Sequence, residues 1–278
     1  MRVVDIIFVI ARRSQSLFGL CLIGIMGLFA LIGPLAAPYD PAAQDLTRIL
    51  EPPSLSHPLG LDHLGRDVFS RVLHGAPRSL GLALLCITIS GGLGTALGLI
   101  AAYAGRIADT VIMRFADLML AFPGILLALF LAGFLGGGLL TILVGINLAF
   151  WPQFARMSRA VALGTLQEPH VEAALLAGFP GRTILSRHVL PPVLIQVLPL
   201  AMLGLGSVVI SISALGFLGL GLQPPTPEWG AMINELFPYL LEAPIQMAGP
   251  CLANFTAVLG LTLVGRALVD EISRRQTW

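Results

Sequence analysis

Long apolar runs without a charged residue alternate along the chain with short segments rich in arginine. The hydrocarbon core of a bilayer is about 30 Å thick, and about 20 apolar residues in a helix cross it. A charge at the centre of such a helix costs about 2.5–3.5 kcal/mol, so charge-free runs locate the expected spans. The pattern predicts transmembrane helices at about 15–37, 79–104, 113–135, 139–161, 192–221 and 246–267.

Glycine clusters and turn signals separate some of these spans from one another. The charge-free run 118–155 is too long for one helix, and the triplet Gly136–Gly138 divides it into the third and fourth spans. The apolar stretch 189–227 is assigned one span, the fifth. Two spans within this stretch are the alternative, although no turn signal divides it near Val209.

The arginines are unevenly distributed between the loops on the two sides of the predicted bundle. If the N-terminus is cytoplasmic, every arginine faces or borders the cytoplasm except Arg48, Arg66, Arg71 and Arg78. Loops on the cytoplasmic side of membrane proteins carry an excess of basic residues, so both termini are expected there. The first apolar run exceeds the usual length of about 7–15 residues in a signal peptide, which favours an uncleaved anchor.

The expected organisation is therefore an all-α polytopic membrane protein with six transmembrane helices. A single transmembrane domain, 14–270, follows a cytoplasmic segment, 1–13, and precedes a cytoplasmic tail, 271–278. Within the domain, segment 38–78 is predicted to be external and loop 163–191 cytoplasmic.

Composition narrows the possible functions. Only 11% of the residues are charged, so we expect the protein to lie in a lipid bilayer. The net charge is +1 and the basic residues are scattered, so we expect no nucleic-acid partner. The chain contains no lysine, whereas a P-loop requires one to hold the β and γ phosphates. If ATP drives this protein, another chain must bind it.

Few polar side chains lie inside the predicted spans. Asp117 lies three residues after Arg114, which allows a local ion pair or a place along a gate. Asn147 suits a hydrogen bond between helices or a contact with substrate. Ser207 and Ser211 either bond to their own helix or line a pore. No hydrolase motif is present, so no catalytic residue and no cofactor are assigned.

The stretch HPLGLDHLGRDVFSR, residues 57–71, is predicted to be a turn followed by a helix on the external side. On a helix, Asp62–Arg66 and Asp67–Arg71 would be ion pairs at i,i+4 spacing. Surface pairs of this kind contribute only about 0.3–0.5 kcal/mol. The stretch therefore has either a structural role or a contact with a partner or the pore mouth.

The external histidines are weak candidates for metal ligands. His57, His63 and His74 have irregular spacing, and no cysteine lies among them. Surface or capping roles explain them as well, so no metal site is assigned.

A polar segment, 168–192, interrupts the apolar chain on the predicted cytoplasmic side. Pro169 suits the first turn of a short helix, and Gly178 suits the position that ends it. The following RTILSRHVL is predicted to form a second helix that ends near Pro191. Small alanines on one face, with Glu172, Arg182 and Arg187 at the edges, favour docking to a soluble partner over an amphipathic element lying on the membrane.

This segment also resembles a known family signature. EAALLAG, followed after nine residues by HVLP, is similar to the Glu-Ala-Ala…Gly loop of bacterial ABC importer permeases, which docks into the ATPase subunit as a coupling helix. The resemblance rests on these positions: Glu172, Ala173, Ala174, Gly178, Leu190 and Pro191. His188 replaces the usual isoleucine, as is typical of the peptide/nickel branch.

Three further stretches resemble the same branch in the correct order along the chain. Residues 57–71 resemble its Gly-x-Asp-x-x-Gly-Arg-Asp signature, and 114–123 and 215–230 resemble its third-span start and fifth-span exit. The signature positions are Gly60, Asp62, Gly65, Arg66 and Asp67.

The resemblance implies a type I ABC importer permease with a cytoplasmic coupling helix in the bacterial inner membrane. It implies a transport subunit rather than an enzyme, with Arg182, Arg187 and His188 among the coupling residues. The implied partners are a homologous permease in a heterodimer, two ATP-binding subunits and an extracytoplasmic substrate-binding protein. PEWGAMIN and APIQMAGP are closest to the nickel-type members, so nickel or a metal chelate is the expected cargo. Import of di- or oligopeptides is the alternative, and an intramembrane enzyme or scaffold is a remote one.

Overall fold

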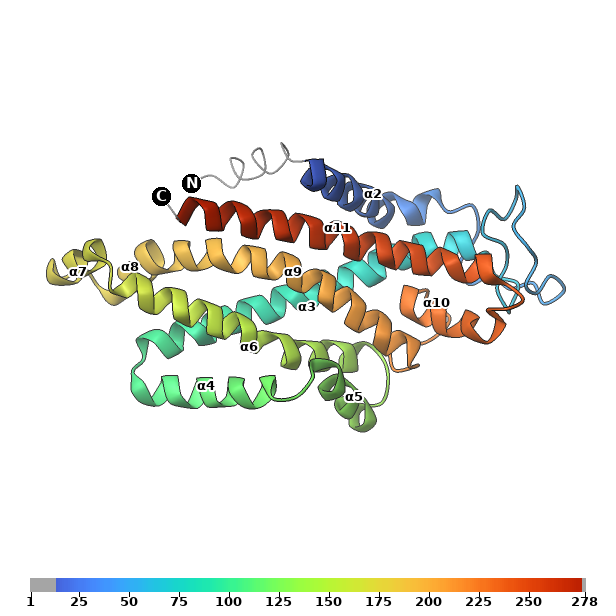
Figure 1. Cartoon of the computed structure of the whole chain (residues 1–278). Helices are drawn as coiled ribbons and strands as arrows, with labels where there is room; N and C mark the ends of the chain where they lie inside the picture. The colour runs from blue at the N-terminus through green and yellow to red at the C-terminus, as the bar shows by residue number, and fades with distance from the viewer. Residues whose placement is uncertain (1–13, 277–278) are drawn as a thin grey trace.

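The computed structural model describes residues 14–276, and this part of the chain consists of helices and irregular segments without a β-strand (Figure 1). The predicted segment 1–13 and the last two residues of the predicted tail lie outside the described residues. The expected all-α fold is confirmed. The elements are α2 (Ser14–Ala36), α3 (Val68–Tyr103), α4 (Arg106–Leu120), α5 (Gly124–Leu135), α6 (Leu139–Leu166), α7 (Pro169–Leu176), α8 (Gly181–Ile184), a π-helical turn η1 (Leu185–Val189), α9 (Leu190–Phe217), α10 (Trp229–Leu236), a 3₁₀ turn η2 (Phe237–Tyr239) and α11 (Pro244–Gln276).

The long helices lie side by side and give the bundle two distinct ends (Figure 1). One end carries α7 and α8 and is called the α7 end. The other carries α10 and the irregular segment 38–67 and is called the α10 end. Within residues 14–276, five helices are long and apolar enough to cross a membrane, and the pair α4 and α5 makes a sixth if it counts as one span.

The third span differs from its expected form. The range 113–135 contains a break instead of one continuous helix, and α4 and α5 meet at a bend of 88°. Pro123 lies at the break and is the N-cap of α5. Because proline disfavours helical backbone in the preceding residue, α4 ends at Leu120 and the chain changes direction before Gly124.

The second span also starts earlier than expected. The helix begins at Val68, inside the segment predicted to be external, because the side chain of Asp67 accepts a hydrogen bond from the Ser70 N–H and caps it. Pro77 lies inside this helix without ending it. At the other end of the chain, α11 continues to Gln276, into the predicted tail.

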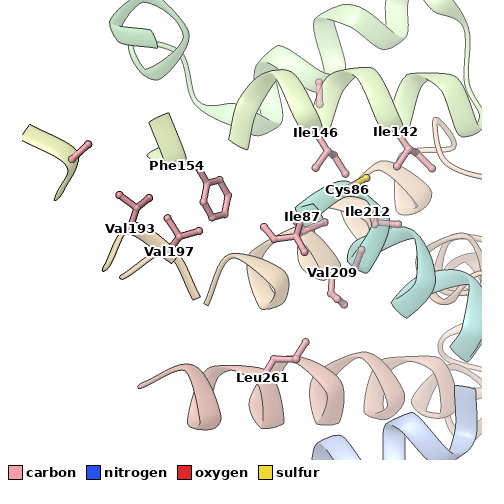
Figure 2. Close-up of a cluster of buried hydrophobic side chains, with 14 of the residues drawn as sticks. Cys86, Ile87, Ile142, Ile146, Phe154, Val193, Val197, Val209, Ile212 and Leu261 are labelled. Atoms are coloured by element: carbon pink, nitrogen blue, oxygen red, sulfur yellow. The ribbon is translucent and has the colours of Figure 1, made fainter. Parts of the chain in front are cut away.

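The core forms where α3, α6 and α9 meet (Figure 2). Cys86 and Ile87 of α3 face Ile146 of α6 and Ile212 of α9 across an apolar interior. Leu261 of α11 adds to the same cluster. Burial of these side chains aligns the three helices along most of their length.

Small residues bring α3 unusually close to α6. A Cβ at Gly94 would lie 2.6 Å from the Cβ of Phe154, and one at Gly98 would lie 2.9 Å from that of Ser158. Two glycines four residues apart allow such an approach between membrane helices. The Ser90 hydroxyl also donates to Asn147 Oδ1 at 2.7 Å, so the observed role of Asn147 is a hydrogen bond between helices.

Candidate functional site

The segment that contains the Glu-Ala-Ala stretch forms the outermost part of the α7 end (Figure 1). Pro169 occupies the first turn of α7, as expected, where its missing N–H leaves no hydrogen bond unmade. The helix ends at Gly178, which has φ +77°. The Gly178 N–H donates to Leu175 O at 3.0 Å and the Phe179 N–H to Ala174 O at 3.2 Å, which is the Schellman arrangement. A residue with a Cβ would strain this backbone.

Two buried side chains fix α7 to the bundle. Val171 and Ala174 point inward and are buried, whereas Ala173 and Glu172 are exposed. Ile184 of α8 is fully buried in the same apolar core as Val171. Of the two alanines of the motif, Ala174 therefore packs against the bundle and Ala173 lies on the surface.

Gly181 sets the position of α8 against α3. A Cβ at this position would overlap the Tyr103 hydroxyl at the end of α3. Any larger residue would displace the Tyr103 side chain from this position, so the glycine allows the segment to lie directly against the end of α3. The sequence did not identify this contact, because Tyr103 and Gly181 are far apart along the chain.

The second short helix does not end near Pro191. Instead, α8, η1 and α9 form one continuous helical rod from Gly181 to Phe217. Pro191 and Pro192 lack the N–H groups that an α-helix would use at this point. The wider π turn, in which the Leu190 N–H donates to Leu185 O, accommodates them. Arg187 and His188 lie in this turn, so they are rigidly connected to α9.

Three charged residues of this segment have no ion-pair partner among the described residues, whereas Glu168 contacts His170 Nδ1 at 3.2 Å. Glu172, Arg182 and Arg187 are exposed, and no ion pair joins any of them to another described side chain. Leu176, also exposed, adds an apolar contact point with 90% of its surface accessible. The surface combines unpaired charges with exposed apolar side chains, as protein interfaces do.

The α10 end has the opposite character. Gly60 and Gly65 have φ of +73° and +71°, and a Cβ at Gly60 would lie 2.6 Å from Glu51 O. At Gly65 a Cβ would overlap the backbone of Asp45. Both signature glycines are therefore required where the irregular segment folds back on itself.

Two arginines are buried in a network of carboxylates at this end. Arg66 Nε donates to Asp62 Oδ2 at 2.7 Å, which confirms the predicted Asp62–Arg66 pair. Arg66 and Arg71 also donate to the same oxygen, Oε2 of Glu235, at 2.6 and 2.7 Å. Both arginines are only 1% exposed. The network joins residues 62–71 to α10.

The predicted Asp67–Arg71 pair was wrong. Asp67 is the N-cap of α3, and its carboxylate contacts His57 Nδ1 at 2.9 Å and accepts from the Ser70 N–H at 2.7 Å. Arg71 reaches Glu235 instead. The i,i+4 argument assumed a helix that already included Asp67, whereas the helix starts one residue later.

Sequence reasoning missed two glutamates at the α10 end. Glu235 is the shared partner of the buried arginines, and Glu228 caps α10 by accepting from Gly230 and Ala231 N–H groups at 2.9 Å. Burial raises the pKa of Glu228, while hydrogen bonds from these amides and from Ser79 act in the opposite direction. The one sequence feature that pointed to these glutamates was the presence of acidic residues in a loop without any basic residue.

The external histidines have separate partners. His57 contacts Asp67, and His74 Nδ1 lies 2.9 Å from Ser70 O. His63 stacks on Tyr239, and its ring comes within 4.8 Å of ligand atoms on Asp62 and Glu235. The carboxylates of Asp62 and Glu235 already pair with the buried arginines, so their negative charges are neutralised within the chain.

The remaining polar candidates lie within the spans. Asp117 pairs with Arg156 of α6 at 2.5 Å, so its partner is on another helix and is not Arg114. Ser211 donates to Ser207 O at 2.9 Å and bonds to its own helix. Ser207 makes a similar but longer bond to Leu203 O, at 3.5 Å.

The fold and the α7 end together define a class: a polytopic helical membrane protein with an exposed segment rigidly attached on one side. Comparison with known proteins gives the family. Residues 94–278 match the family described as "Binding-protein-dependent transport system inner membrane component", and residues 8–53 match the "N-terminal TM domain of oligopeptide transport permease C". The chain belongs to the dipeptide/oligopeptide/nickel family of ABC importer permeases, which are multi-span proteins of the inner membrane.

Individual relatives support this assignment over nearly the full length. The chain is 37% identical over 265 residues to the nickel transport system permease protein NikC of Escherichia coli strain K12, covering 95% of this chain and 96% of NikC. It is 40% identical over 260 residues to the glutathione transport system permease protein GsiD of Pectobacterium atrosepticum, covering 93% and 85%.

A solved structure shows the same fold. A chain of the MetNI methionine ABC transporter in an inward-facing conformation aligns with TM-score 0.56 at 20% identity, covering 74% of this chain and 95% of that one. The type I importer permease architecture expected from the sequence is thereby confirmed.

Proposed function

We propose that this permease transmits ATP hydrolysis, carried out by separate subunits, to a transport pathway through its α7 end. The observation that carries the proposal is the combination of exposed, unpaired charges on the segment 172–187 with its continuous helical connection to α9. A movement of a docked subunit would act on a rod that spans the bilayer. In this proposal the α7 end and both termini lie in the cytoplasm.

The proposed assembly contains a second, homologous permease, two ATP-binding subunits and an extracytoplasmic substrate-binding protein. The absence of lysine supports an ATP site on another chain, since the P-loop lysine is lacking. This chain would supply half of the pore. The switch between outward- and inward-open states would be a rearrangement of packed helices.

The proposed cargo is nickel or a metal chelate, because a relative that aligns with this chain over 96% of the relative's length is a nickel permease. Import of small peptides is the second candidate, because a relative of higher identity is a glutathione permease. If nickel is carried as a chelate with an organic acid, both candidate cargoes contain organic carboxylate groups.

Uptake by a reconstituted complex tests the proposal. Proteoliposomes with this chain, its partner permease, the ATPases and the binding protein are expected to accumulate radioactive nickel or radioactive glutathione only when ATP is supplied to the ATPase side. Accumulation without ATP, or of neither probe with ATP, would contradict the proposed function.

A further inference from the structure

A charged hollow of about 340 Å³ lies between α4 and α6, outside the α7 segment and the α10 network. Figure 1 shows α4 running alongside α6 at the edge of the bundle. The hollow is lined by Asp109, Thr110, Met113, Arg114, Asp117, Arg156 and Arg159.

The hollow lies near one end of the predicted spans, because the charge-free run 118–155 ends at Asp117 and Arg156, whereas the charge-free run of the neighbouring α3 continues further. The run from Ser79 to Gly105, most of it in α3, carries no charge. Thr95 and Gly98 in this run lie against Ser158 and Arg159 of α6. With a rise of about 1.5 Å per residue, Gly98 lies about 10 Å inside the Gly105 end of that run. Charges at this level are expensive against lipid, so they face water or protein.

The exposed surface of α4 is divided into two flanks. Ile107 and Val111, with 83% and 64% of their surfaces accessible, lie on an apolar flank that suits lipid. Thr110, Arg114 and Asp117 follow each other at helical spacing on the other flank and line the hollow. The hollow therefore adjoins the lipid-facing flank, on the side of α4 that lies against α6.

The charges of the hollow do not balance. Asp109 pairs with Arg159, and Asp117 pairs with Arg156. Arg114 is exposed and forms no ion pair with any described carboxylate. Three arginines face two aspartates, which leaves one guanidinium available.

We propose that this hollow binds a carboxylate group of the cargo during its passage, with Arg114 as the primary ligand. A guanidinium presents two parallel N–H donors that match the two oxygens of a carboxylate. Arg156, with a side chain 54% exposed, is positioned to share the group by moving away from Asp117. The lining residues include no histidine or cysteine, so the hollow selects an organic anion and not a bare metal ion.

The inference rests on the proposed transport function and adds the chemistry that the pathway recognises. A carboxylate is common to peptides and to carboxylate chelates of nickel. The headgroup of an anionic lipid is the competing source of an oxyanion, and the choice of lipid in the test separates it from the cargo.

The test compares Arg114→Gln with Arg106→Gln in the reconstituted complex. Arg106 is also an exposed arginine of α4 but does not line the hollow. Two probes are used, radioactive glutathione and radioactive nickel supplied with citrate. For the probe that the wild type imports, Arg114→Gln is expected to raise KM or lower the uptake rate about tenfold, in line with the loss of a charge-assisted hydrogen bond. Arg114→Lys should recover part of the loss, and Arg106→Gln should stay within about twofold of wild type.

The outcomes separate this inference from the proposed function. If the wild type imports neither probe, the transport proposal falls. If the wild type imports a probe and both glutamine variants behave alike, the carboxylate site is refuted while the transport proposal stands. A defect of Arg114→Gln that disappears in vesicles made only of zwitterionic phosphatidylcholine would assign the hollow to the headgroup of an anionic lipid and also refute the cargo site.

Discussion

The two ends of this permease treat their charged residues in opposite ways. At the α10 end, Arg66 and Arg71 are almost completely buried and share Glu235. At the α7 end, Glu172 and Arg187 are exposed and have no opposite charge among the described residues. Buried charges that are paired within the chain hold the fold together, whereas exposed unpaired charges remain available for another subunit.

The energetic consequence is that mutations at the two ends should separate stability from assembly. Removing one member of a buried ion network costs about 3–5 kcal/mol, because the other members keep their desolvation penalty. Removing an exposed, unpaired charge changes stability little. Variants at the two ends, with matched controls, test this division.

The largest effect is expected for Glu235→Ala. Arg71 would keep a 3.6 Å approach to Asp62 and a long hydrogen bond to Pro41 O at 3.5 Å, and Arg66 would lose one of its two carboxylates. The unfolding free energy of the purified protein in detergent should fall by about 3–5 kcal/mol. The matched control is Glu242→Ala, an exposed glutamate between η2 and α11. Equal unfolding curves for the two variants would remove the structural role of the α10 network.

A smaller effect is expected for Gly178→Val at the α7 end. A left-handed backbone at a residue with a Cβ costs about 1–2 kcal/mol, so the Schellman turn should rearrange and displace α7. Co-purification of the ATPase should fall several-fold while the transmembrane bundle remains folded. Gly178→Asn is the control, since asparagine tolerates this conformation. Normal ATPase recovery with valine would show that the turn does not position the docking surface.

Glu172→Ala should weaken ATPase binding without a change in unfolding temperature. The charge projects from the exposed face of α7, so its loss removes an intermolecular contact only. An exposed contact of this kind contributes about 0.2–1 kcal/mol, which corresponds to an affinity loss of about 1.4- to fivefold. Titration of the ATPase against the permease in nanodiscs measures it. Unchanged affinity, or a lower unfolding temperature, would place Glu172 among the structural residues.

The smallest effect is expected for His63→Gln. His63 stacks on Tyr239 beside a network whose carboxylates already bind arginines, so metal transfer through it is not required. Nickel uptake should stay within about twofold of wild type at limiting nickel. His74→Gln, whose imidazole contacts Ser70 O, serves as the comparison. A selective loss of nickel uptake with His63→Gln would instead indicate a metal-binding role.

The sequence predicted the α7 end better than the α10 end, and the physical reason is the range of the interactions. Pro169 and Gly178 act within one helical turn, so their roles followed from local chemistry. Arg66 and Arg71 depend on Glu235, which lies more than 160 positions away and has no local signature. The i,i+4 rule therefore predicted an ion pair between Asp67 and Arg71, whereas Asp67 caps the helix.

The transmembrane pattern shows the same limit. Charge-free runs located the long helices, because the cost of a charge near the centre of a membrane helix can be read from the local sequence without knowledge of tertiary contacts. The 88° bend at Pro123 and the continuous rod through Pro191 both involve prolines, with opposite results. At Pro191 a π turn accommodates the proline without breaking the helix, and the sequence did not reveal this turn.

Site-directed cross-linking tests the central claim most directly. Leu176 at the α7 end and Leu241 at the α10 end are both leucines and are 90% and 97% exposed. In a background without the three native cysteines, each is replaced by cysteine and treated with a short bifunctional thiol reagent in the assembled complex. The account predicts that Leu176→Cys captures the ATPase subunit and Leu241→Cys does not. Capture of the ATPase from Leu241→Cys, or from neither position, would contradict it.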